Sequence, residues 1–487
     1  MRAMSQRYDV RRYDGPRRPG QGPSFAAPGY SLALSPVAGS VDSSQSTRHV
    51  FAPDSSPFQG SPLVETRFAT LCLDAFFEYK YPINPILNRQ HIEAALLDLG
   101  SDPETYGMIV ACCAVMVQSP GLLAPLSTST PSAFLPSPSP YALTHETPSA
   151  SFLIEETIRA RCSCNYIEAP SLITVQTSFF LFSALFCLGK DNSAWFYLRE
   201  AITFLQLLDL HEEDTFASSL QNDPILSTYS RRMFWVLFIT ERAYAIQRHR
   251  APTLEKTIAL PYEGTEVEKE ILPGFFALIA LFEPFDNDFF ALWNHSVVLP
   301  TLPAELLVRM QRILMYTLPT TSGCTDSQLA DLLISREWLK IMIWQLCVSN
   351  TMLSSLSNEE SMSFRYPITI AREVILVSKL VPLKALEANG VGILEKVFDI
   401  GCSLADVLSL KPIFSEPSML EVGPRNYLSE IIRIVGTTLG GSDKHLQILL
   451  RKASECLPTV VDRPLSATED NSSERYQVYE LEDNADD

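Results

Sequence analysis

From Ser151 to about Cys456 the chain repeats one pattern, in which apolar residues stand three or four positions apart between stops of Pro, Gly, Asp or Asn. This spacing is typical of one face of an α-helix. No run of alternating polar and apolar residues joined by a two-residue hairpin turn appears in the sequence, and no short-period repeat is evident. We therefore predict an all-α, multi-helix fold.

Several helix boundaries follow from the same pattern. An amphipathic helix is expected from Val64 to the stop at Pro82, and Thr325 with Gln328 fits a capping box that starts another helix. In a third, Trp195, Leu198, Ile202 and Leu205 predict a buried stripe. Further helices are predicted over His91–Leu99, Pro103–Val117, Ile154–Ala160, Pro170–Leu188, Asn192–Leu210, Ile225–Arg248, Ala304–Leu318, Thr369–Leu380, Val391–Leu410 and Ser418–Thr438.

Composition divides the chain into five parts. Pro, Gly, Ser and Arg dominate the first residues, and Pro, Ser and Thr dominate an internal stretch; neither shows the periodic apolar pattern that offsets chain entropy. We predict a disordered basic arm over residues 1–60, the first part of a helical domain over 61–118, an inserted loop over 119–150, the main helical domain over 151–460 and an acidic disordered tail over 461–487. The arm could serve nuclear import or contact a DNA backbone, but a solvated tail is favoured.

Charge and cysteine content limit the function classes. The formal charge of −18 excludes a whole-chain electrostatic binder of nucleic acid. Ten scattered cysteines are too few for a disulfide scaffold, so reduced thiols inside the cell are expected, and the first residues lack the apolar stretch of a secretory signal. The uncharged, largely apolar run Ser171–Gly189 contains five Ser, Thr or Gln residues after its first position, which favours a buried helix over a membrane span.

Signatures of catalysis are weak. The seven histidines show no metal-ligand spacing, and Cys162 and Cys164 stand closer than the usual zinc pair, so both are expected to be core thiols. No GxSxG, GxxxxGK[ST] or GxGxxG motif occurs. We predict no catalytic residue, no cofactor and no metal.

One enzyme alternative stays open, a magnesium-dependent all-α terpene cyclase. Asp209, Glu212, Glu213 and Asp214 could imitate its first acidic motif, and Asn350, Ser354 and Asn358 have the spacing of its second. However, Asn358 stands where that motif needs Glu, so an anionic ligand is missing. A third class, a cytosolic ligand-binding scaffold, has no motif of its own.

The segment Arg231–Leu254 differs from a generic helix. It carries the pair Arg231 and Arg232, then Phe234 with Trp235, then Glu241 with Arg242, then a basic turn and Pro252. Buried charges on one helix need partners because their desolvation is costly. We expect Glu241 and the arginines to form an ion-pair network between neighbouring helices, and we favour this over direct ligand contact.

This segment resembles the regulatory middle homology region of fungal zinc-cluster transcription factors. Pro170–His211, with Trp195, is similar to the preceding helix pair of that family, and Ala75–Leu87 to its first helix. Tyr366–Leu408 resembles the C-terminal part of its amylolytic and maltose-utilisation regulators. The resemblance spans roughly residues 64–410 and implies a helical regulatory domain in which Trp195, Arg231, Arg232, Trp235, Glu241 and Arg242 are structural motif residues.

The sequence also departs from the family. Its members bind DNA through an N-terminal cluster of six cysteines around two zinc ions, whereas the first cysteine here is Cys72, within a predicted helix. In addition, His249-Arg250-Ala251-Pro252 stands where the family has Arg directly before Pro, so the turn there is expected to differ. Three explanations stay open: a partner-dependent regulator, a protein that alters a pathway regulator, or a gene prediction that omits the exon for the cluster.

The resemblance implies a nuclear transcription regulator of a metabolic or biosynthetic gene set. Without a cluster it would reach DNA only indirectly, through other transcription factors or co-regulators, with heterodimers among the arrangements. The acidic tail, in which Tyr476, Val478, Tyr479 and Leu481 stand among acids, has the composition of an activation segment, with a solubilising tail as the alternative.

Overall fold

The computed structural model describes residues 58–127, 147–261, 268–294, 304–316, 323–349, 360–410, 423–437 and 443–456. Within those ranges every regular element is helical, which confirms the predicted all-α class. None of the described helices is long and apolar enough to cross a membrane. The residues 1–57 of the predicted arm, most of the predicted loop, and the tail lie outside the described residues.

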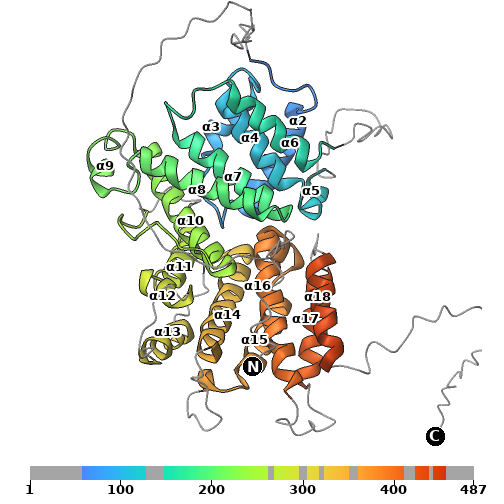
Figure 1. The fold of residues 1–487 in the computed structure, drawn as a ribbon. Coiled ribbons are helices and arrows are strands. Elements are labelled where there is room, and N and C mark those ends of the chain that lie inside the picture. Colours follow the sequence, from blue (N-terminus) through green and yellow to red (C-terminus); the bar gives the residue numbers. More distant parts are fainter. Residues whose placement is uncertain are drawn as a thin grey trace, which may run out of the picture. The chain divides into compact units, whose positions relative to one another are not determined.

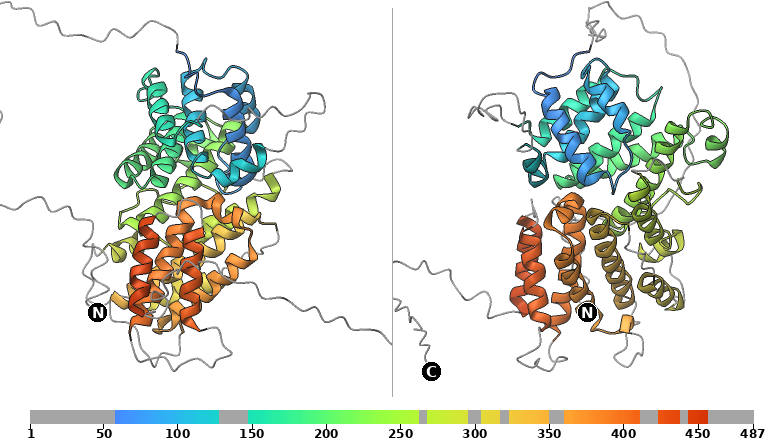
Figure 2. Two further views of the ribbon diagram at one scale, coloured as in Figure 1. Left: turned by 90° about the vertical axis from the view of Figure 1, so that its right-hand side faces the viewer. Right: turned by 180° about the vertical axis from the view of Figure 1, so that it is seen from behind.

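A first group of helices packs around α4 and α7, as Figures 1 and 2 show. It comprises α2 (Thr66–Ala75), the π-helix η2 (Phe76–Lys80), α3 (Arg89–Leu96), α4 (Pro103–Met116), α5 (Pro120–Ser127), α6 (Ala150–Cys162), α7 (Leu172–Cys187) and α8 (Asp191–Leu207). Helix α4 is apolar on all sides and is buried from Thr105 to Met116. Its start is fixed by Asp102, whose carboxylate accepts from the amides of Glu104 and Thr105.

Helix α10 (Pro224–Arg248) follows the short α9 (Glu213–Ala217) and contacts α7, α8 and α11. Asp223 caps its start, with Leu226 N donating to the carboxylate over 2.9 Å, and Pro224 occupies the first turn. Its end lies at His249, where φ is 49°. The turn that was expected to differ from the family pattern is therefore a left-handed one, and the His249 ring stacks on Trp293 with centroids 4.8 Å apart.

A second group packs around α14 and α16. The elements after α10 are η3 (Glu268–Glu270), α11 (Leu272–Phe282), α12 (Asn287–Trp293), α13 (Ala304–Tyr316), α14 (Asp326–Ser349), η4 (Glu360–Met362), α15 (Tyr366–Leu380), α16 (Leu383–Ser409), α17 (Pro424–Thr437) and α18 (Asp443–Cys456). The predicted capping box is present: Thr325 N donates to Gln328 Oε1 over 3.1 Å, and Gln328 N donates to Thr325 Oγ1 over 3.3 Å.

Among the polar contacts that connect the groups, two end on main-chain carbonyls. Gln328 Nε2 donates to Pro82 O over 2.8 Å, and the buried Lys80 amine donates to Ala388 O over 2.8 Å. Ala388 precedes Gly390, where φ of 61° breaks α16 into two stretches. The predicted helix from Val391 thus coincides with the second stretch. Burial lowers the pKa of the Lys80 amine.

Three expectations need correction. Helix α5 occupies Pro120–Ser127, within the predicted loop, because Pro is tolerated in a first turn and Leu122 is fully buried. Helix α7 is a buried helix, as predicted for Ser171–Gly189, but it starts only at Leu172 behind a Ser171 cap. Cys162 is exposed and Cys164 half-buried, so neither is a core thiol.

Candidate functional site

Four charged side chains of α10 are buried almost completely. Glu241 and Arg232 have no exposed surface, and Arg231 and Arg242 are each 4% exposed. Burying a charge is costly unless it is paired or hydrogen-bonded. The contacts of these residues therefore show what α10 holds in place.

Arg231 attaches α9 and the segment after α10 to the helix. Arg231 Nη1 donates to Glu213 Oε2 over 2.8 Å, and Nη2 pairs with Oε1. Glu213 Oε2 also accepts from Ala259 N over 2.8 Å, and Ala259 O accepts from Trp235 Nε1 over 3.0 Å. The hydrogen bonds from Arg231 hold the pKa of the Glu213 carboxyl below its ordinary value.

Arg232 connects α10 with two other parts of the chain. Its Nη1 donates to Glu268 Oε1 over 2.7 Å, and the hydroxyls of Tyr81 and Tyr229 lie 3.3 and 3.4 Å from the same oxygen. Burial raises the pKa of the Tyr229 hydroxyl, so the phenol stays protonated and can donate. The first helix group, α10 and η3 therefore meet at a single carboxylate.

Glu241 holds the turn that follows α10. Its carboxylate accepts from the amides of Thr253 and Leu254, each over 2.9 Å, and from Arg199 Nη1 on α8 over 2.8 Å. The sequence predicted that Glu241 and the arginines of its helix form one network. The structure instead pairs Glu241 with Arg199 of α8 and gives Arg231 and Arg232 separate carboxylates, those of Glu213 and Glu268.

Arg242 has a different environment. Its Nε donates to Phe285 O over 3.0 Å, and its guanidinium lies 3.4 Å from the centroid of the Phe238 ring. Burial lowers the pKa of Arg242 to about 10. Its contacts thus fix the end of the segment that carries α11, without an ion pair from any of the described residues.

Two tryptophans of the predicted motif differ in burial. Trp235 is fully buried, whereas Trp195 is only half-buried and stacks on Tyr244, with centroids 5.6 Å apart and planes 9° apart. Of the predicted stripe on α8, Leu198, Ile202 and Leu205 are fully buried. The expectation that Trp195 shares that burial is wrong, since it lies near the start of α8, at the margin of the core.

Sequence reasoning missed the partners and one further arginine. Arg248, the last residue of α10, contacts Asp191 and Glu395. Glu213, Glu268 and Glu395 lie 18, 36 and 147 positions from their arginines, so no local spacing indicates them. The one available signal was the number of buried cations on α10, each of which needs an anion.

The enzyme alternative finds no support in these contacts. In the described part of the chain no three His, Cys, Asp or Glu side chains are grouped so that they could hold a metal. Glu213, from the first acidic motif, is paired with Arg231. Asn350, Ser354 and Asn358 lie outside the described residues.

Comparison with known proteins agrees with the resemblance seen in the sequence. Residues 73–273, which include α10, match the fungal specific transcription factor domain. The probable sucrose utilization protein SUC1 of Candida albicans is 27% identical over 343 residues, which cover 70% of this chain and 64% of that protein. The maltose fermentation regulatory protein MAL13 of Saccharomyces cerevisiae is 23% identical over 243 residues, half of each chain.

A third relative is the respiratory transcription factor ZNF1 of Saccharomyces cerevisiae, 27% identical over 213 residues, which cover 43% of this chain and 44% of that protein. The chain thus spans between about two fifths and two thirds of the length of these relatives. No solved structure matches it. The predicted similarity to maltose-utilisation regulators is confirmed.

Proposed function

Because residues 73–273 form a fungal specific transcription factor domain, we propose that this chain is a transcription regulator and not an enzyme. The match across this domain is the observation that carries the proposal. The geometry of α10 supports it, since the charged residues of the matched segment make their contacts within the chain. Internal contacts of this kind are expected of a regulatory domain whose role depends on how its helices are arranged.

The regulated genes are proposed to serve sugar utilisation. Two of the relatives are named for sucrose utilisation and maltose fermentation, and the third is named as a respiratory transcription factor. Identities of 22–27% and partial coverage make this a proposal about the class of genes, namely carbon metabolism, and not about one sugar.

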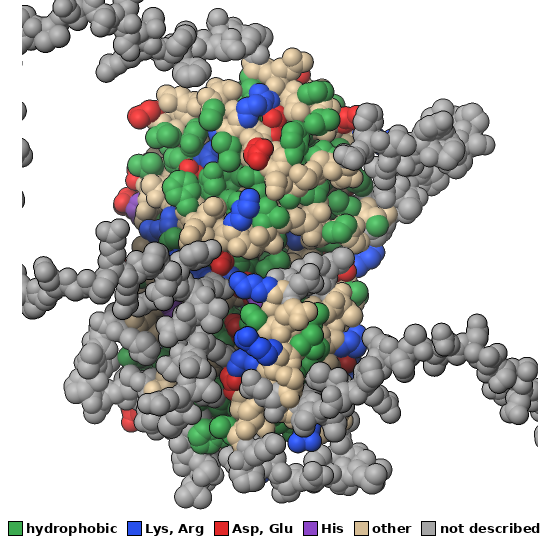
Figure 3. Space-filling model, turned by 45° about the vertical axis from the view of Figure 1, so that its right-hand side comes forward, with side chains coloured by type: hydrophobic (Ala, Val, Ile, Leu, Met, Phe, Trp, Pro, Cys, Tyr) green, Lys and Arg blue, Asp and Glu red, His purple; other side chains and the backbone are tan. Residues whose placement is uncertain are grey.

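Action through partner proteins, in the nucleus, is the second part of the proposal. The chain carries a formal charge of −18, so we favour contact with DNA through another regulator over direct contact. On the face drawn in Figure 3, apolar side chains are spread among polar ones over the first helix group. Exposed apolar residues of the described chain include Leu97, Phe196 and Leu207, which suit protein contacts.

Chromatin association tests this function directly. The full chain, carrying an epitope tag, is mapped on chromatin in cells with and without a co-expressed zinc-cluster family member. We expect occupancy upstream of sugar-utilisation genes that depends on the co-expressed partner. Occupancy without any partner would contradict indirect binding, and no occupancy in either case would contradict the regulatory function. The control is a chain that carries both Arg232→Met and Glu268→Leu. It lacks the ion pair between these residues and so shows what the loss of an internal contact does to occupancy.

The acidic tail is tested separately. Residues 462–487 fused to an unrelated DNA-binding domain should raise reporter output if they form an activation segment. The matched control replaces Tyr476, Val478, Tyr479 and Leu481 by Ser and keeps every acid. Equal output from both fusions would mean that charge alone acts, and no output from either would leave the tail a solubilising segment.

A further inference from the structure

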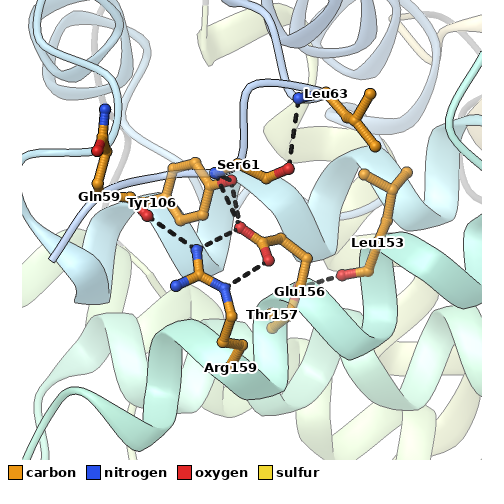
Figure 4. Close-up of polar contacts among 8 residues, drawn as sticks. All are labelled: Gln59, Ser61, Leu63, Tyr106, Leu153, Glu156, Thr157 and Arg159. Atoms are coloured by element: carbon orange, nitrogen blue, oxygen red, sulfur yellow. Dashed lines mark hydrogen bonds and ion pairs between the residues drawn. The ribbon is translucent and has the colours of Figure 1, made fainter. Parts of the chain in front are cut away.

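The first four described residues lie across α4 and α6 as a strap, Phe58–Ser61 (Figure 4). The strap is held mainly by Glu156 on α6, a residue that is 6% exposed. Glu156 Oε1 accepts from Ser61 N over 3.1 Å and from the Tyr106 hydroxyl over 2.7 Å. The Tyr106 hydroxyl in turn accepts from Ser61 N over 2.8 Å, so the Ser61 amide is shared between the two oxygens. Arg159 completes the site with two hydrogen bonds of 2.7 Å to the same carboxylate.

The strap fits closely against these helices. Arg159 Nη2 donates to Gln59 O over 2.9 Å, and its guanidinium lies 5.0 Å from the centroid of the Phe58 ring. Phe58 also meets Tyr106 edge to face, with centroids 5.5 Å apart. A Cβ added at Gly60 would lie 2.6 Å from the Tyr106 ring, so only glycine fits there. These contacts make the strap a specifically held peptide.

The strap ends in an accessible Ser-Pro dipeptide. Ser61 is partly exposed, and Pro62 and Leu63 are exposed. Ser61 starts a turn in which its carbonyl accepts from Val64 N over 3.0 Å and its hydroxyl accepts from Leu63 N over 3.3 Å. A serine followed by proline, at the edge of a domain, is the substrate that proline-directed protein kinases use. The hydroxyl oxygen is therefore three bonds from the amide nitrogen that donates to Glu156.

We propose that Ser61 is a phosphorylation site and that its phosphorylation releases the strap Phe58–Ser61 from α4 and α6. In the modification, Ser61 Oγ attacks the γ-phosphorus of ATP, the Oγ–P bond forms, and the bond to ADP breaks. The hydroxyl proton passes to the base of the kinase. The product carries close to two negative charges beside a carboxylate.

Charge at the site explains the release. Hydrogen bonds from Arg159 and Tyr106 outweigh burial and hold the pKa of Glu156 below its ordinary value, so Glu156 is ionised at neutral pH. A phosphate on Ser61 would then add negative charge to the residue whose amide donates to this carboxylate, and like charges repel. Arg159, half exposed, is the nearby cation that could turn toward the phosphate, but doing so would leave Glu156 without its ion pair. Both outcomes weaken the hold on the Ser61 amide.

Hydrogen exchange of the full chain tests the proposal. The chain is phosphorylated with a proline-directed kinase and ATP, modification of Ser61 is verified by mass spectrometry, and exchange is followed in the peptide that contains residues 58–64. Hydrogen bonds to charged groups correspond to roughly ten- to hundredfold in a local opening equilibrium. We expect exchange of the Ser61 amide to accelerate about tenfold or more, while exchange in α10 stays unchanged.

Two variants serve as matched controls. Ser61→Ala keeps the backbone donor and the other Ser-Pro dipeptides, so kinase treatment of this variant should not change exchange at residues 58–64. In Glu156→Gln the like charge is absent, so phosphorylation should add far less acceleration than in the unaltered chain. Full modification of Ser61 with unchanged exchange would overturn the proposal. So would failure of the kinase to modify Ser61 in the folded chain while it modifies Ser61 in a peptide of residues 58–66.

Discussion

Arg248, the last residue of α10, donates two parallel hydrogen bonds to Glu395 on α16, Nη1 to Oε2 and Nη2 to Oε1, each over 2.7 Å. The same guanidinium donates from Nε to Asp191 at the start of α8 over 3.0 Å. Both partners in the α16 contact are nearly buried, with 11% and 8% of the side chains exposed. One side chain thus joins three helices from both helix groups.

Breaking this pair should be costly. Glu395→Gln removes the charge that offsets a buried guanidinium, and we expect a loss of about 3 kcal/mol in the free energy of unfolding, measured by urea titration. The matched control is Glu430→Gln, which breaks the more exposed pair with Arg433 and should cost at most about 1 kcal/mol. Equal losses in the two variants would contradict the assigned role of Arg248.

Replacing the two motif tryptophans should lower the free energy of unfolding by different amounts in the same urea titration. Trp235→Ala removes a fully buried ring and its hydrogen bond to Ala259 O, so we expect a loss of about 3 to 5 kcal/mol. Trp195→Ala removes a half-buried ring stacked on Tyr244, and about 1 to 2 kcal/mol is expected. A loss of free energy above that range for Trp195→Ala would indicate that Trp195 belongs to the core.

Acid should weaken the contact between α9 and α10. Since the pKa of Glu213 is lowered in the folded chain, its contribution to stability is complete above its ordinary pKa of 4.5 and declines as pH falls below that value. The difference in unfolding free energy between the unaltered chain and Glu213→Gln should therefore be constant above about pH 5.5 and shrink below pH 4.5. A pH-independent difference would show that Arg231 does not stabilise the carboxylate.

Raising the pH should stabilise the folded chain through Lys80. Burial lowers the pKa of this amine from 10.5, so the unfolded chain binds a proton over a pH range in which the folded chain does not. As pH rises toward 10.5, the unaltered chain should gain stability relative to Lys80→Met. Lys384→Met, at an exposed position near the start of α16, serves as the control for loss of a lysine.

Local signals predicted much of the fold. The capping box of Thr325 and Gln328 and the proline at Pro224 mark helix starts that the structure confirms. Helix α11 was missed because Leu272–Phe282 is apolar on nearly every side, so its sequence has no periodicity to detect. Helix α5 was missed because its two prolines were taken as breakers, although one lies in the first turn.

Only part of the candidate site could be predicted from the sequence, namely the charges of α10 and not their partners. The buried charges of α10 stand out in sequence because a helix seldom carries so many among aromatic residues. Their partners do not, since Glu213, Glu268 and Glu395 lie on three other elements, α9, η3 and α16. Tertiary contacts of this kind leave no spacing in the chain, and the half-burial of Trp195 depends on them too.

The hydrogen bond from Lys80 to Ala388 joins residues 308 positions apart. At about 5 to 20 residues per second, a ribosome needs roughly 15 to 60 seconds between the two codons. During that interval the amine has no acceptor from α16 and stays hydrated. The first helices therefore emerge with a polar side chain exposed to solvent that is buried in the complete fold. Burial of this amine therefore waits for the synthesis of α16, and codons that slow translation between residues 80 and 388 would lengthen the interval.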